Sequence, residues 1–159
     1  MDLSKRLNAV YNGNYQGCGK VYKWKYLCCE CKKSFKRISE QDLKEDEISQ
    51  QPHSCPECGN QTLRIGPKFR PPKKSDDSRW NSLKVLLKLK FSHFFSWSTD
   101  EIEIPNSKSK LKSLLEELEQ YSKQQMDIWS RSDYGDASEQ VRGWHEKHKA
   151  INSELQKLK

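Results

Sequence analysis

Cys28-Cys29-Glu30-Cys31 and Cys55-Pro56-Glu57-Cys58 are the two short stretches that decide the fold of this chain. Each stretch places two thiols across a two-residue gap, and 23 residues separate the two pairs. A loop of this kind presents two sulfur atoms from one tight turn, and two loops supply the four thiolates of a tetrahedral zinc site. We therefore predict that Cys28, Cys31, Cys55 and Cys58 bind a structural Zn²⁺.

The chemistry of such a site is stabilising rather than catalytic. Four bound sulfur atoms leave no coordination position for water or substrate. Structural zinc contributes on the order of 10 kcal/mol to the folding of small domains. Two alternatives are reduced cysteines without a metal and an iron site of the same geometry. Cys29 could replace Cys28 as a ligand, but it is separated from Cys31 by one residue and fits the turn less well.

Composition supports a need for this metal. In 159 residues, 33% are hydrophobic and 32% are charged, and the mean hydropathy is −1.03, so the chain has little material for a large core. The N-terminus lacks the pattern of a secretory signal, and the longest apolar tract, residues 85–95, is short and contains charges. We therefore expect a soluble protein of the reducing cytoplasm that does not bind membranes.

Hydrophobic periodicity predicts an α+β fold: a small three-stranded antiparallel ribbon followed by a helical C-terminal region with an antiparallel helical hairpin. The predicted strands begin near Val21, Ser34 and Gln61, and the predicted helices cover about 78–90, the leucine-rich segment from Leu111 to Ile128, and Ala137 to Leu158. The last helix repeats apolar residues at coiled-coil spacing. We divide the chain into a flexible segment at 1–19, a zinc ribbon at 20–66, a basic Pro-rich connector at 67–77 and a helical domain at 78–159.

The first of these folded units resembles the zinc-ribbon family. The resemblance rests on Tyr26-x-Cys28-x-x-Cys31 with Phe35 four residues later, and on Cys55-Pro56-Glu57-Cys58-Gly59 before a short strand. It covers roughly residues 20–66 and implies a rubredoxin-like site of four cysteines on a small sheet. Lys32 departs from the family pattern, in which a glycine commonly follows the second cysteine. The continuation from Phe69 into a helix is also similar to uncharacterised small bacterial zinc-ribbon proteins, a similarity that implies no activity.

Basic residues concentrate in the ribbon and connector, where they alternate with aromatic residues. Residues 1–38 contain nine Lys or Arg against two Asp or Glu, whereas residues 107–159 contain ten against nine. Such a pattern suits phosphate contact and base stacking, and RNA is a better candidate than DNA. The candidate nucleic-acid-binding residues are Lys23, Trp24, Lys25, Lys32, Lys33, Lys36, Arg37, Arg64, Lys68, Arg70, Lys73 and Lys74. Alternatively, the aromatic residues fill the small core and the lysines form a solvated face.

Two functional hypotheses follow from these patterns. The first is a nucleic-acid-binding adaptor, associated with RNA or a ribonucleoprotein, whose C-terminal helices bind a protein partner. The second is a subunit for protein assembly without nucleic-acid contact, which would use the apolar segment from Phe91 to Trp97 and the helical seam at Trp144. The sequence contains no phosphate-binding Gly-rich loop, nucleophile elbow or convincing pair of catalytic carboxylates, so we do not expect an enzyme.

Overall fold

The computed structural model describes residues 23–38, 54–66, 69–91 and 103–159. Its first part is a three-stranded antiparallel sheet of β1 (Lys23–Cys28), β2 (Lys33–Ile38) and β3 (Leu63–Ile65), in the order β2-β1-β3. Strand β1 pairs with both neighbours, so Tyr26 lies opposite Phe35 on one side and Arg64 on the other. The predicted antiparallel ribbon is therefore confirmed as a sheet.

Three helices follow: α3 (Asp77–Lys88), α4 (Lys108–Ser130) and α5 (Ala137–Lys157). Two of these helices begin at a residue whose side chain caps the helix. The side chain of Asp76 accepts a hydrogen bond from the Arg79 amide at 3.1 Å, and Ser107 accepts one from the Lys110 amide at 3.2 Å. These contacts satisfy amide groups that a helix leaves without intrahelical acceptors, which explains why α3 and α4 begin where they do.

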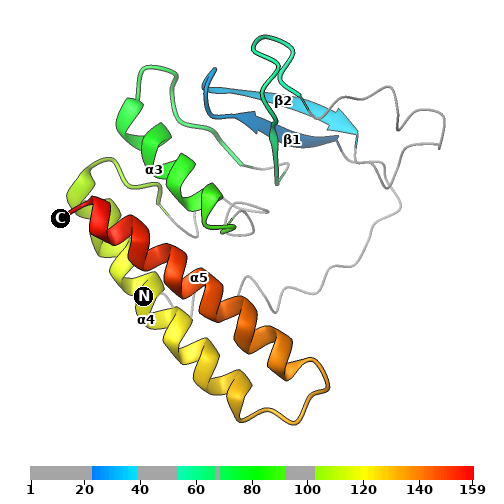
Figure 1. Ribbon diagram of the computed structural model, residues 1–159. Coiled ribbons are helices and arrows are strands. Elements are labelled where there is room, and N and C mark those ends of the chain that lie inside the picture. The colour runs from blue at the N-terminus through cyan, green and yellow to red at the C-terminus, as the bar shows by residue number, and fades with distance from the viewer. Residues whose placement is uncertain (1–22, 39–53, 67–68, 92–102) are drawn as a thin grey trace.

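Helices α4 and α5 form the predicted antiparallel hairpin, in which α5 runs back beside α4 from a short turn (Figure 1). The seam uses the apolar positions expected from the sequence. Trp144 and Ile151 are buried, and the Trp144 ring meets the Tyr121 ring edge to face with centroids 5.5 Å apart. Leu115 and Leu118 of α4 are fully buried on the facing side. The hairpin is thus stabilised by a continuous apolar contact.

One hydrophobic cluster joins the sheet to the helices. Leu27 and Ile65 of the sheet belong to the same buried cluster as Trp80 of α3 and Leu115 of α4, and Phe69 of the connector is also fully buried in it. Helix α3 lies between the sheet and the hairpin in Figure 1. The described part of the connector therefore contributes to the core, although the predicted division into domains stays a prediction.

Several sequence-based expectations concern residues outside the described part of the chain. These are the flexible segment at 1–19, the connector residue Lys68, and the apolar residues Phe94, Phe95 and Trp97. Phe91, at the start of that apolar segment, is described and fully buried. Within the described residues, none of the helices has the length and apolar character needed to cross a membrane.

Candidate metal centre and basic sheet face

The four predicted ligand cysteines lie together at one end of the sheet. Their Sγ atoms all lie within 4.8 Å of one another. The Cys28 and Cys58 sulfur atoms are 3.5 Å apart, and those of Cys31 and Cys55 are 3.8 Å apart. A tetrahedron with Zn–S bonds of about 2.3 Å separates its sulfur atoms by about 3.8 Å. The group therefore has the chemistry and the spacing to hold a metal ion.

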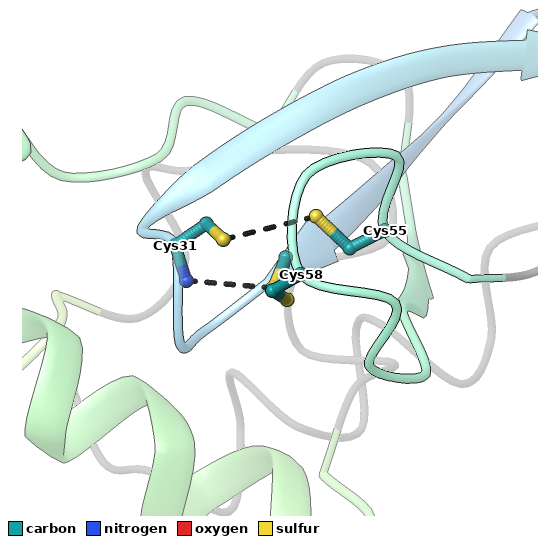
Figure 2. Close-up of side chains that lie close together, drawn as sticks. Cys31, Cys55 and Cys58 are labelled. Carbon is teal, nitrogen blue, oxygen red and sulfur yellow. Dashed lines mark hydrogen bonds between the residues drawn. The ribbon is translucent and has the colours of Figure 1, made fainter.

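The two loops approach one another from different parts of the chain. Cys28 ends β1 and Cys31 lies in the turn that leads to β2, whereas Cys55 and Cys58 lie in the loop before β3. Figure 2 shows Cys31 facing Cys55 and Cys58 across the space between the loops. Pairing of β1 with both other strands brings the loops to the same end of the sheet.

Backbone contacts shape each loop around its two thiols. The Cys31 amide donates to Cys28 Sγ at 3.4 Å, and the Gly59 amide donates to the Cys55 carbonyl at 2.9 Å. The residue after the second cysteine has a positive φ in both loops, 53° at Lys32 and 73° at Gly59. The two turns are therefore alike in conformation, although one uses lysine where the other uses glycine.

The thiols strongly influence one another's protonation. Burial raises the pKa of Cys28, and hydrogen bonding with Cys58 together with burial raises the pKa of Cys31 to about 12. At Cys55, burial opposes ionisation, but the amides of Cys58 and Glu57 donate to the sulfur and lower its pKa to about 7. Four thiolates this close repel one another, and a bound divalent cation would compensate that repulsion.

Cys29 lies apart from this group. Its side chain packs against the hydrophobic cluster, and burial raises its pKa to about 11. Cys28 is the last residue of β1 and belongs to the sulfur cluster, whereas Cys29 lies in the turn that follows and packs against the core.

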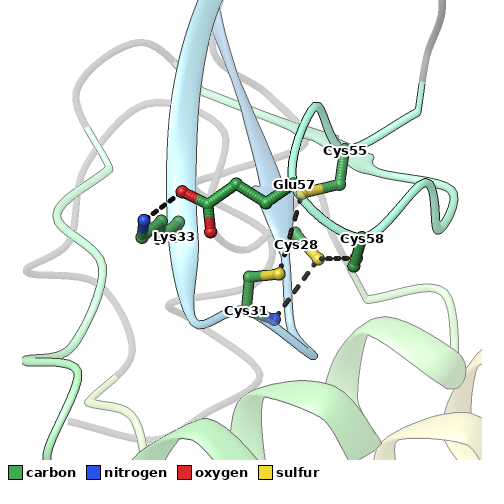
Figure 3. A network of polar contacts seen from close by, with 6 residues as sticks. All are labelled: Cys28, Cys31, Lys33, Cys55, Glu57 and Cys58. Atoms are coloured by element: carbon green, nitrogen blue, oxygen red, sulfur yellow. Dashed lines mark hydrogen bonds and ion pairs between the residues drawn. The ribbon is translucent and has the colours of Figure 1, made fainter.

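Ion pairs surround the sulfur cluster. Lys33 pairs with Glu57, which connects the first loop to the second (Figure 3). Lys32 pairs with Asp77 at the start of α3, and Glu30 pairs with Lys84 of the same helix. These contacts orient the first loop against the second loop and against α3, although exposed pairs contribute little to stability. Sequence analysis did not identify the partners Glu57 and Asp77, because nothing in their local sequence indicates them.

The face of the sheet opposite Leu27 carries the aromatic and arginine residues of the predicted nucleic-acid interface. Leu27 points into the core, so Trp24 and Tyr26 of β1 point to the other face. Trp24 lies opposite Arg37 of β2, and the Arg64 guanidinium carbon is 4.9 Å from the centroid of the Trp24 ring. Trp24 and Arg37 are half-buried and Arg64 is exposed. The structure therefore brings three of the predicted residues together on one surface.

A second group of basic residues lies on the other face. Lys25 and Lys36 are directly opposite one another on β1 and β2, and Lys25 donates a hydrogen bond to the Phe69 carbonyl. Burial lowers the pKa of Lys25, and the positive charges of Lys36 and Arg70 lower it further. Like charges directly opposite one another destabilise a sheet. The three cations together would favour a nearby anion.

The remaining predicted contact residues are spread more widely. Lys23 at the start of β1 is exposed, and so are Lys73 and Lys74 in the connector. Lys32 and Lys33 are engaged in the ion pairs described above. The structure thus places the predicted basic residues on both faces and on the connector rather than on one continuous surface.

Comparison of the chain with protein-family models, with curated proteins and with solved structures finds no match.

Proposed function

We propose that this protein is a zinc-stabilised, non-catalytic adaptor that binds single-stranded nucleic acid, RNA in preference to DNA, and docks a protein partner through its helical hairpin. It acts in a reducing compartment such as the cytoplasm, where thiolate ligands are not consumed by disulfide formation. The observation that carries the nucleic-acid proposal is the arrangement of Trp24, Arg64 and Arg37 on one face of the sheet.

Zinc is the metal that best suits the sulfur cluster. Four cysteine sulfur atoms at tetrahedral spacing match the shell of structural zinc sites, and all four positions around the ion would be filled by protein. The ion would then fix the two loops and leave no site for a substrate. A structural role for the ion follows from that filled shell, and no reaction would take place at the metal.

The sheet face has the properties that unpaired bases need. The Trp24 ring offers a surface on which a base can stack, and a stacked base contributes about 1–3 kcal/mol. Arg64 already lies over that ring, and guanidinium groups can both stack on bases and contact phosphates. Bases are available for stacking in single strands and loops, which are commoner in RNA. This availability of unpaired bases supports single-stranded RNA as the proposed ligand.

The test is binding of fluorescently labelled single-stranded RNA by the zinc-loaded full chain, measured by anisotropy at two salt concentrations. Replacing Trp24 with Ala removes one stacking surface, so we expect the Kd to increase by roughly five- to a hundredfold. Arg64→Gln removes one phosphate contact, so the dependence of log K on log salt decreases by about 0.7. Single-stranded DNA and double-stranded RNA of matched length serve as competitors.

Lys110→Gln is the matched control for this experiment. Lys110 is an exposed lysine of α4, outside the sheet and outside the candidate nucleic-acid-binding residues, so we expect less than a threefold change in Kd. Equal zinc content and equal circular dichroism in all variants exclude a folding defect. If the Trp24 and Arg64 variants bind as tightly as the parent, the sheet face does not bind nucleic acid.

A protein-assembly role without nucleic acid is the second candidate. It is favoured by one observation, that the cationic groups of Lys25, Lys32 and Lys33 are all engaged by acceptors of the chain itself. Fewer basic groups are then available for phosphates than the sequence suggests. RNA binding that is weak and insensitive to salt would favour this candidate.

A further inference from the structure

A groove lies between the two helices of the hairpin. Its volume is about 320 Å³, and it lies towards the turn that joins α4 to α5. Its walls are predominantly apolar and are formed by Tyr121, Gln125, Trp129, Gln140, Gly143, Trp144 and Lys147. This size and this lining are typical of sites that accept one or two large side chains or a small ligand.

Gly143 is the first unusual feature of the groove. Glycine in the interior of a helix lowers stability by about 1 kcal/mol relative to alanine. Close packing against another element often explains such a glycine, but a Cβ added at Gly143 would have no atom within 4 Å. The described fold therefore does not require glycine there. A molecule that approaches the backbone of α5 closely from outside would require it.

Lys147 is the second unusual feature. Its ammonium group lies 4.7 Å from the Trp144 ring centroid and 5.2 Å from that of Phe91, so it is held against aromatic rings at the groove. Burial lowers the pKa of Lys147, and the positive charge of Lys90 lowers it further. No carboxylate of the described residues forms an ion pair with it. A desolvated cation of this kind is better accommodated when a negative charge lies beside it.

An exposed aromatic residue lies at the end of the groove. Tyr134, in the turn between the helices, is 76% exposed and packs against Trp129 with ring centroids 6.5 Å apart. Tryptophan and tyrosine residues at the rim of a cavity are typical of the residues that dominate protein interfaces. The groove thus continues into an exposed aromatic surface.

We propose that this groove is a docking site for an acidic segment of a partner protein, which inserts an aromatic or large aliphatic side chain beside Gly143 and places a neighbouring Asp or Glu against Lys147. The proposal rests on the docking half of the function proposed above and names its residues. The apolar walls accept the inserted side chain, Gly143 provides close access to the backbone, and the lysine selects the charge of the segment.

The test uses the zinc-loaded full chain and a display library of random twelve-residue peptides. We expect enriched peptides to contain an aromatic or large aliphatic residue next to Asp or Glu. For such a peptide, Gly143→Leu fills the groove and weakens binding at least tenfold. Lys147→Gln weakens it at least fivefold, whereas changing the peptide's acidic residue to Asn or Gln reduces affinity for the parent but not for the Lys147 variant.

The matched control is Lys149→Gln, an exposed lysine on the same helix outside the groove, and it should retain binding within threefold. Single-stranded RNA binding is measured on every variant, and unchanged RNA binding with lost peptide binding separates the groove from the sheet face.

Three results would overturn the proposal. The first is a library with no enriched peptides, and the second is enriched peptides without a carboxylate or with full affinity for Gly143→Leu. The third is a dimer in sedimentation experiments that Gly143→Leu dissociates, because a second copy of the chain would then occupy the groove.

Discussion

Lys32 and Gly59 occupy equivalent positions in the two cysteine loops, and their contrast shows how a local backbone requirement can be met at a cost. Both have positive φ values, which glycine adopts freely and other residues adopt at a cost of roughly 1–2 kcal/mol. Lys32 offsets part of that cost through its contact with Asp77. The first loop is therefore strained where the second is relaxed.

Two substitutions at Lys32 separate the backbone strain from the ion pair. Lys32→Ala and Lys32→Gly both remove the contact with Asp77, but only glycine relieves the positive φ. After allowance for the greater flexibility of glycine in the unfolded chain, we expect Lys32→Gly to be more stable than Lys32→Ala by roughly 0.5–1 kcal/mol. Urea denaturation of the zinc-loaded variants measures this difference. Equal stability would show that the turn does not strain a lysine.

The grouping of the four sulfur atoms could be predicted from the sequence, whereas the ion pairs around them could not. Cysteine spacing indicates a shared turn, so Cys28, Cys31, Cys55 and Cys58 were expected to meet, and the structure brings them together. By contrast, Lys32 and Asp77 are 45 residues apart, and Lys33 and Glu57 are 24 apart. Charged residues have no comparable spacing rule, so their pairing required the tertiary structure.

Helix α3 contacts the hairpin through a buried carboxylate of α5. Periodicity predicted each of the three described helices because apolar spacing is a local signal. It could not predict that Glu154, a charged residue on α5, would be only 9% exposed. Glu154 accepts hydrogen bonds from Lys88 of α3 at 3.0 Å and from Lys157 of its own helix at 2.7 Å. This carboxylate therefore links α3 to the end of the hairpin.

Replacing Glu154 with Gln tests this link. Burial raises the pKa of the carboxyl, but hydrogen bonds from Lys157 and Lys88 outweigh it, and the pKa lies below its ordinary value of 4.5. A lowered pKa in the folded state stabilises the protein above the ordinary value, and the stabilisation is lost as pH falls through the folded pKa. Because both lysines are more than half exposed, we expect Glu154→Gln to lower the free energy of unfolding by about 1 kcal/mol at pH 7.

The pH dependence distinguishes this contact from simple packing. The difference between parent and Glu154→Gln should diminish as pH decreases below 4.5 and disappear once the pH has fallen through the lowered pKa of the folded state, because the folded parent then carries a neutral carboxylic acid. Thermal unfolding from pH 7 to pH 3 measures it, with the exposed Glu117→Gln on α4 as the control. A difference that stays constant over this range would assign the effect to shape rather than charge.

At the scale of the whole molecule, the proposed zinc ion would stabilise chiefly the sheet, whereas most of the hydrophobic cluster lies on the helices. Structural zinc contributes on the order of 10 kcal/mol, which is comparable to the total stability of an ordinary domain. The small sheet would depend on the proposed ion because its strands are short and supply few residues to the cluster, chiefly Leu27 and Ile65. The hairpin supplies more of the cluster, including Leu115, Leu118 and Ile151, which are fully buried. The two parts should therefore respond differently to loss of the metal.

Removal of zinc with a chelator should unfold the sheet and leave the hairpin folded. Amide hydrogen exchange is expected to accelerate most in β1, β2 and β3, moderately in α3, and least in α4 and α5. Helix α3 is intermediate because it shares the cluster with the hairpin but also pairs with the first cysteine loop through Asp77 and Lys84.

Cys55→Ser should reproduce the chelated state, whereas Cys29→Ser should retain one zinc per chain, because the Cys29 thiol faces the core. Equal acceleration in sheet and hairpin would instead show a single cooperative unit, in which the shared cluster outweighs the independent seam of the hairpin.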